Sequence, residues 1–160
     1  MLIRNAERGD AADLVRLRAI MLEQVIGGPV PGEDMEVIEK FFADWDYDDP
    51  LCLVAEEEGA VLGCIAASFY RLFPGTRNPS GLLAVVHNFA VYEEYRGGGV
   101  GKSLFSHVLR ECRERGVGRV SLNATAMGRP LYESFGFSTE VISCPEMRLY
   151  HKALIELDLG

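Results

Sequence analysis

The stretch Tyr95-Arg96-Gly97-Gly98-Gly99-Val100-Gly101-Lys102-Ser103 decides the fold. It follows an apolar run, 82–91, that predicts a buried strand, and it leads into a helical pattern of apolar residues from Val100 to Cys112. Glycines let an anion approach the backbone, and the first turn of a helix has unpaired N–H groups. We therefore predict a phosphate-binding turn at 96–102.

Two other phosphate-binding motifs do not fit this turn. The Walker A loop needs a glycine five residues before its Gly-Lys-Ser, and that position is Arg96. The dinucleotide fingerprint GxGxxG also fails, because its last glycine would fall on Lys102 or Leu104. The pattern that matches is Arg-x-x-Gly-x-Gly, carried by Arg96, Gly99 and Gly101.

A second motif follows downstream. Asn123 ends a short predicted strand, and Leu131-Tyr132-Glu133-Ser134-Phe135-Gly136-Phe137 gives the pattern Leu-Tyr-Glu-x-x-Gly-Phe. Together the two motifs resemble the pyrophosphate signature and the following helix of the GNAT acetyltransferases. The close resemblance covers 82–137, and the flanks agree only in the order of their elements.

The resemblance implies a single α/β domain (α+β mixed) over 1–160. Its central mixed, mostly antiparallel sheet would have about seven strands flanked by about four helices, with splayed fourth and fifth strands. The sequence pattern gives the order βααβββαβαββ. We expect a first helix from Asp10 to Gly27, with Leu14, Leu17, Met21 and Val25 on one face. The other expected elements are Met1–Arg4, Glu33–Phe42, Leu51–Glu56, Ala60–Tyr70, Leu82–Val91, Val100–Gly116, Val120–Ala124, Arg129–Phe135, Glu140–Ser143 and Glu146–His151.

Acetyl-CoA is the cosubstrate that the resemblance implies, with no metal. Strand residues would bond pantetheine through their main chain, the glycine turn would bind the pyrophosphate, and Asn123 would support the pantetheine arm. The expected cofactor-binding residues are Phe89, Ala90, Val91, Arg96, Gly97, Gly98, Gly99, Val100, Gly101, Lys102, Asn123 and Tyr132.

Two residues are candidates for acid–base catalysis. Tyr132 stands where the family has a tyrosine that protonates the coenzyme A thiolate; otherwise it is a core tyrosine. His87, in the predicted strand 82–91, is the candidate base, and its ordinary pKa of about 6.5 suits that role. A hydrogen-bonded core histidine is the plainer reading. Weaker candidates for the base are Glu23, Asp34 and Glu36.

The charge argues against a nucleic-acid partner. The net charge is −8 and no basic patch is visible. Between 31 and 58 there are eleven Asp or Glu and one Lys, which is either a solvated surface or a rim that attracts a cationic acceptor. Trp45 and Tyr47 lie among these acids, and they form either a cation-binding wall or the anchors of a loop.

The composition predicts a cytoplasmic protein with no membrane partner. No apolar stretch approaches membrane-spanning length, and residues 1–8 do not show the basic region followed by an apolar region that is typical of a signal peptide. The cysteines (Cys52, Cys64, Cys112 and Cys144) are expected to be reduced thiols, mostly in the core.

The acceptor stays open: a small-molecule amine or a peptide amine would both serve. The sequence also leaves open whether the acyl group is acetyl or longer, and whether the protein forms a homodimer. The alternatives to an enzyme are a non-catalytic CoA-binding sensor and a protein-interaction module.

Overall fold

The computed structural model describes residues 1–139 of the 160-residue chain. In this part the centre is a mixed sheet whose five strands lie in chain order: β1 (Leu2–Asn5), β2 (Leu51–Glu57), β3 (Ala60–Arg71), β4 (Leu82–Val91) and β5 (Arg119–Leu122). Neighbours from β1 to β4 are antiparallel, whereas β5 runs parallel to β4. A parallel pair needs a long crossover, and here a helix supplies it.

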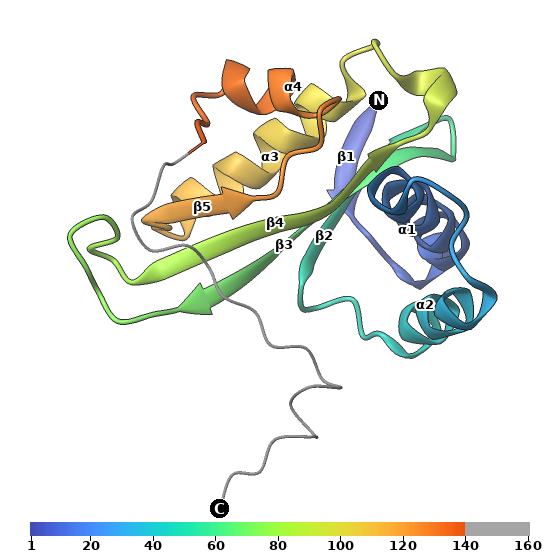
Figure 1. Cartoon of the computed structure of the whole chain (residues 1–160), viewed down its shortest axis with the longest axis horizontal. Coiled ribbons are helices and arrows are strands. Elements are labelled where there is room, and N and C mark those ends of the chain that lie inside the picture. Colours follow the sequence, from blue (N-terminus) through green and yellow to red (C-terminus); the bar gives the residue numbers. More distant parts are fainter. Residues whose placement is uncertain (140–160) are drawn as a thin grey trace, which may run out of the picture.

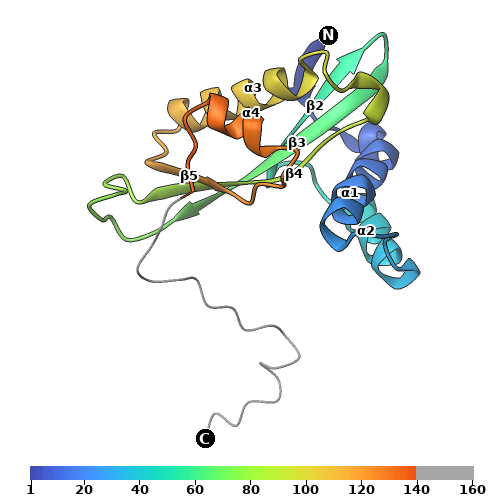
Figure 2. The same cartoon turned by 45° about the horizontal axis from the view of Figure 1, so that its top comes forward.

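Helices cover both faces of the sheet. α1 (Ala11–Ile26) and α2 (Gly32–Asp44) lie on one face, and α3 (Val100–Glu114) and α4 (Arg129–Ser134) lie on the other (Figures 1 and 2). Two short 3-10 turns, η1 (Arg8–Asp10) and η2 (Glu93–Tyr95), complete the described elements. Among residues 1–139, none of the helices is both long enough and apolar enough to cross a membrane.

The hydrophobic core has two layers, one on each face of the sheet. On the α3 face, Leu104, Phe105 and Val108 are fully buried. On the α1 face, Leu14 and Leu17 are fully buried. Each side chain of this size contributes about 1.5–3 kcal/mol on burial, so both helices are fixed against the sheet mainly by these contacts.

Strand β4 changes its inward face partway along. The register with β3 shifts between Cys64 and Ala66, and Asn88 has a φ of 49°, a left-handed conformation that asparagine tolerates. Before this bulge, Val86 packs into the α3 layer, whereas Ala90 after it packs into the α1 layer. A bulge therefore turns the last residues of β4 over, and it re-aims their side chains.

The expected elements agree with the structure to within two residues at each described end, and β4 agrees at both ends. One side chain was wrongly assigned: Val25 is 65% exposed, because the last turn of α1 lies beyond the packed part of the helix. The expected strands Glu140–Ser143 and Glu146–His151 lie outside the described residues, as does Cys144, while Cys52, Cys64 and Cys112 are buried free thiols.

Candidate functional site

The glycine turn joins β4 to α3. Gly97 (φ 78°) and Gly99 (φ 86°) both have left-handed backbone conformations, which bring the chain abruptly into the helix. Gly99 is the N-cap residue, and no side chain caps the helix. Within residues 1–139 the backbone N–H groups of 97–102 find no acceptor, and the first bond across the cap is that from Ser103 N to Gly99 O, at 2.9 Å. The turn thus presents unbonded donors at the positive end of the α3 dipole, as an anion site requires.

The turn lies directly against the end of β4. A Cβ on Gly101 would come within 3.3 Å of Phe89 Cζ, so only glycine fits there without displacing the ring. Arg96 Nε donates to Val91 O at 3.0 Å, which fixes the start of the turn to the strand. The side chains of Arg96 and Lys102 are exposed, so their cationic groups are accessible to a phosphate.

The end of β4 is not paired with β5. The parallel register covers only Leu83–Val86 of β4, opposite Arg119–Leu122. Phe89, Ala90 and Val91 lie beyond it, and Asn123, exposed, follows the last residue of β5. β5 therefore ends before it reaches the part of β4 from which the glycine turn begins, and the backbone of that part has no partner in β5.

Tyr132 on α4 lies in an aromatic cluster with Phe105 on α3 and Phe89 on β4. Its ring centroid is 5.2 Å from that of Phe105 and 6.2 Å from that of Phe89, and the residue is 9% exposed. Its hydroxyl has no hydrogen-bond partner within residues 1–139. Burial raises the pKa of the Tyr132 phenol above its ordinary value, so the phenol stays protonated at neutral pH. The structure thus brings Tyr132, Phe89 and the glycine turn together.

His87 faces the other side of β4. Its Nε2 lies 2.9 Å from Ser68 Oγ on β3, and its ring remains exposed. Desolvation by the surrounding protein, and then the positive charge of Arg18 on α1, lower the pKa of His87. A neutral imidazole at pH 7 can accept a proton, as a base must. The weaker candidates Glu23, Asp34 and Glu36 are exposed carboxylates on α1 and α2.

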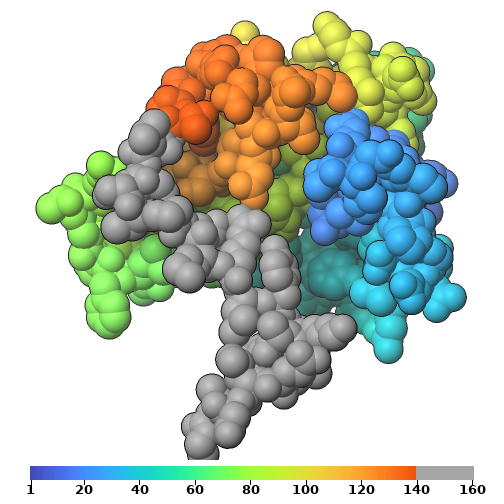
Figure 3. Space-filling view, in the orientation of Figure 1, coloured from blue at the N-terminus to red at the C-terminus, as the bar shows by residue number. Residues whose placement is uncertain are grey.

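Helix α1 is tied to the end of β4 by a polar cluster. Tyr92 Oη donates to Asp13 Oδ1 at 2.7 Å, and Arg16 donates both to Asp13 (2.7 Å) and to Tyr92 Oη (3.2 Å). In Figure 3, α1 in blue and the segment after β5 in orange stand on either side of the part of β4 that is visible between them. Helix α1 and the glycine turn are therefore both held to the end of one strand, β4.

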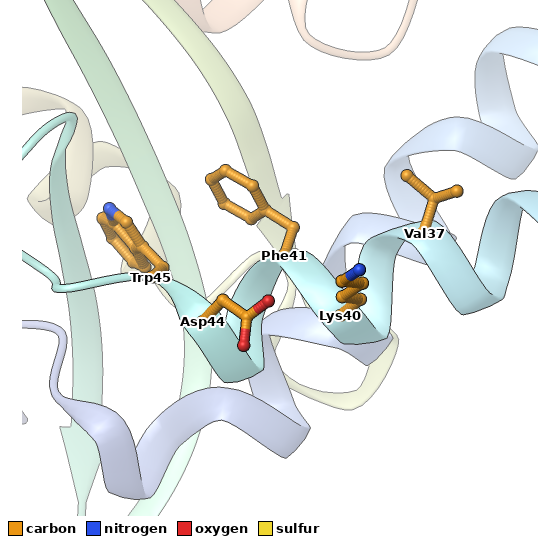
Figure 4. Close-up of a pocket in the computed structure, with 5 residues that line it drawn as sticks. All are labelled: Val37, Lys40, Phe41, Asp44 and Trp45. Atoms are coloured by element: carbon orange, nitrogen blue, oxygen red, sulfur yellow. The ribbon is translucent and has the colours of Figure 1, made fainter.

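The aromatic residues among the acids anchor a loop. Trp45 Nε1 donates to Asp49 O at 2.8 Å, Tyr47 Oη donates to Phe42 O at 3.0 Å, and the two rings lie 4.3 Å apart. Both polar tips are thus satisfied within the loop. A shallow pocket of about 400 Å³ lies beside it, with Val37, Phe41 and Trp45 on one side of α2 (Figure 4). Its lining comes from α2 and the residue after it, not from β4, α3 or α4.

Three residues near β4 were missed by the sequence reasoning. Ser68 gave no signal, because a serine in a strand is unremarkable. Asn88 interrupts an apolar run, which can mark a bulge. Arg18 is a charged residue within the apolar stripe of α1, beside Leu17, and that position was a signal that could have been found.

Sequence comparisons agree with this geometry. A profile of the Acetyltransferase (GNAT) family matches residues 16–137. An uncharacterized N-acetyltransferase of Chlorobaculum tepidum is 29% identical over an alignment of 124 residues, and the match covers 74% of this chain and 64% of that protein. The chain therefore spans less than two thirds of the length of this relative.

Solved structures share the fold. A predicted acetyltransferase from Clostridium acetobutylicum, solved with acetyl-CoA, has a TM-score of 0.75 at 23% identity, and the match covers 94% of this chain and 98% of that one. A GCN5-related N-acetyltransferase from Ralstonia eutropha JMP134 has a TM-score of 0.74 at 25% identity, with 91% and 97% covered. The family profile spans most of the chain, and it includes strand β4, the glycine turn and the second motif. The chain therefore belongs to the acetyltransferase (GNAT) family.

Proposed function

We propose that this protein transfers the acetyl group of acetyl-CoA to a primary amine by direct attack of the amine on the thioester. The observation that carries the proposal is the row of unbonded N–H groups at 97–102, next to a strand end that β5 leaves unpaired. The amides, with Arg96 and Lys102, would bind the pyrophosphate through charge-assisted hydrogen bonds. The backbone of Phe89–Val91 would bind the pantetheine arm as an added strand would, and Asn123 would support it from β5.

Tyr132 is the proposed general acid. Bound acetyl-CoA supplies an activated acyl group whose leaving group is a thiolate. A phenol that stays protonated, packed on Phe89 beside the turn, can give that leaving group a proton. The absence of a hydrogen bond from its hydroxyl within residues 1–139 leaves the donor available for this role.

His87 is the proposed base. A free primary amine has a pKa of about 10.4, so roughly one molecule in a few thousand is neutral at pH 7. The lowered pKa of His87 keeps the imidazole neutral and able to take the proton, directly or through a water. The hydrogen bond to Ser68 fixes the ring at Nε2.

The acetylation of a panel of amines tests the proposal. Release of free thiol from acetyl-CoA should depend on both the amine and the enzyme. Tyr132→Phe should lower kcat by at least about tenfold, since acid–base groups usually contribute about 10²–10⁴, and it should leave acetyl-CoA binding nearly unchanged. Unchanged turnover would remove Tyr132 from the mechanism. Binding of acetyl-CoA without transfer to any amine would favour a CoA-binding sensor.

A further inference from the structure

Arg18 lies on the side of α1 that faces the sheet. The residues one turn before and after it on the helix are all apolar: Leu14, Val15, Met21 and Leu22. Leu14 is fully buried, as is Leu17, the residue immediately before Arg18, and α1 packs against β4. Arg18 itself is half-buried. A guanidinium has thus been placed in the apolar stripe that fixes the helix.

No group within residues 1–139 neutralises this guanidinium. Arg18 makes no hydrogen bond and no ion pair there, whereas Arg16 on the same helix pairs with Asp13 at 2.7 Å. Asp13 is also occupied by Tyr92. Burial lowers the pKa of Arg18, which remains charged at neutral pH. A charge that is partly removed from water without a partner costs free energy, and natural chains usually pair it.

The charge of Arg18 acts on two residues at the bulge of β4. It lowers the pKa of His87, and it also acts on the buried thiol of Cys64, which donates to the main-chain oxygen of the bulge residue Asn88. The α1 side of the bulge therefore contains the neutral imidazole and, near it, a cation that is not paired by any group of residues 1–139. An amine positioned for attack at His87 would have its other substituents beside Arg18.

We propose that Arg18 binds an anionic group, a carboxylate or a phosphate, carried by the acceptor amine. This rests on the proposed function and names its substrate class: a small amine with an acidic group, not a polyamine. A guanidinium forms two parallel hydrogen bonds with such a group, which would fix the amine relative to the strand. The acids at 31–58 lie on α2, the loop after it and β2, so they do not compete for the guanidinium by any contact in the described structure.

Equilibrium binding to the full-length protein tests this inference. The protein, saturated with coenzyme A, is titrated with pairs of amines that differ in one acidic group: phenylalanine and phenethylamine for the carboxylate, phosphoethanolamine and ethanolamine for the phosphate. In at least one pair the acidic member should bind about tenfold or more tightly, as expected for a hydrogen bond to a charged group. The pair that shows the preference identifies the source of the anion.

Three variants separate the explanations. Arg18→Gln should abolish the preference, Arg18→Lys should retain part of it, and Arg113→Gln, which removes an exposed charge from α3 on the opposite face, should change nothing. The melting temperature of Arg18→Gln should equal or exceed that of the wild type, because the lost charge has no partner among residues 1–139. A fall of several degrees would assign Arg18 a structural role instead. Lack of preference in both pairs, or a preference that survives Arg18→Gln, would overturn the inference.

Failure of the proposed function is recognised by a different measurement, the binding of acetyl-CoA. If acetyl-CoA does not bind, the transferase proposal is lost, whereas the amine pairs can still be titrated on the free protein. Equal losses of turnover for acidic and neutral acceptors in Arg18→Gln would instead show that Arg18 acts on the reaction and not on the acceptor, which also overturns the inference.

Discussion

The conformation of the glycine turn can be tested by one methyl group. Gly99 has φ 86° and ψ −1°, and a Cβ added there would have no atom within 4 Å. Steric crowding therefore contributes nothing to the effect of Gly99→Ala. The whole cost is that of holding an L-residue in a left-handed conformation, roughly 1–2 kcal/mol.

The conformational cost of Gly99→Ala must lower either the free energy of unfolding or the affinity for acetyl-CoA. If the turn keeps its shape in the free protein, the free energy of unfolding falls by about 1–2 kcal/mol, which for a domain of this size lowers the Tm by roughly 2–8 °C. If the free turn relaxes, stability falls less, and acetyl-CoA binding must restore the strained shape. The affinity then falls by about tenfold for each 1.4 kcal/mol.

Two variants of the same turn serve as controls. Gly98→Ala adds the same methyl group at a residue whose φ is outside the left-handed region, with only an ordinary contact to Tyr95 O at 3.7 Å. It should change stability and affinity little. Gly99→Asn should recover part of the loss, since asparagine tolerates the left-handed region. Thermal unfolding and calorimetric titration with acetyl-CoA provide both readings. If Gly98→Ala is as harmful as Gly99→Ala, the turn does not have the conformation described.

Two further predictions concern the base and the core. His87→Ala should remove the acidic limb of the pH–rate profile. In the wild type that limb should lie below pH 6.5, because burial and the charge of Arg18 lower the pKa of His87 from its ordinary value of about 6.5. An unchanged acidic limb in the variant would exclude His87 as the base. Leu17→Ala should lower the free energy of unfolding by about 2–5 kcal/mol because the side chain is fully buried, whereas Val25→Ala, at a residue 65% exposed, should change it by less than about 0.5 kcal/mol, as measured by chemical denaturation. Similar losses in the two variants would contradict the packing of α1.

Much of the fold was readable because local signals and burial agreed. The apolar run Leu82–Val91 gave strand β4 at both ends, and the spacing from Val100 to Cys112 gave the buried face of α3. Glycines with left-handed φ end α1 at Gly27 and follow α4 at Gly136. These features are local, so a short window of sequence contains them.

Other features depend on contacts between distant segments. The bulge at Asn88 reverses the faces of β4, which simple alternation along the strand does not predict. The bond between Ser68 and His87 depends on the register of β3 against β4. The lack of a partner for Arg18 within the described part of the chain depends on which carboxylates the fold brings near α1. The conformation of the glycine turn was therefore predictable from sequence, whereas the surroundings of His87 and Arg18 were not.

The central claim concerns the turn after β4, and one titration tests it most directly. The purified protein is titrated calorimetrically with acetyl-CoA, with ATP as the control for phosphate binding in general. We expect saturable binding in the micromolar range with acetyl-CoA and none with ATP. No binding of acetyl-CoA, or equal binding of both, would contradict it.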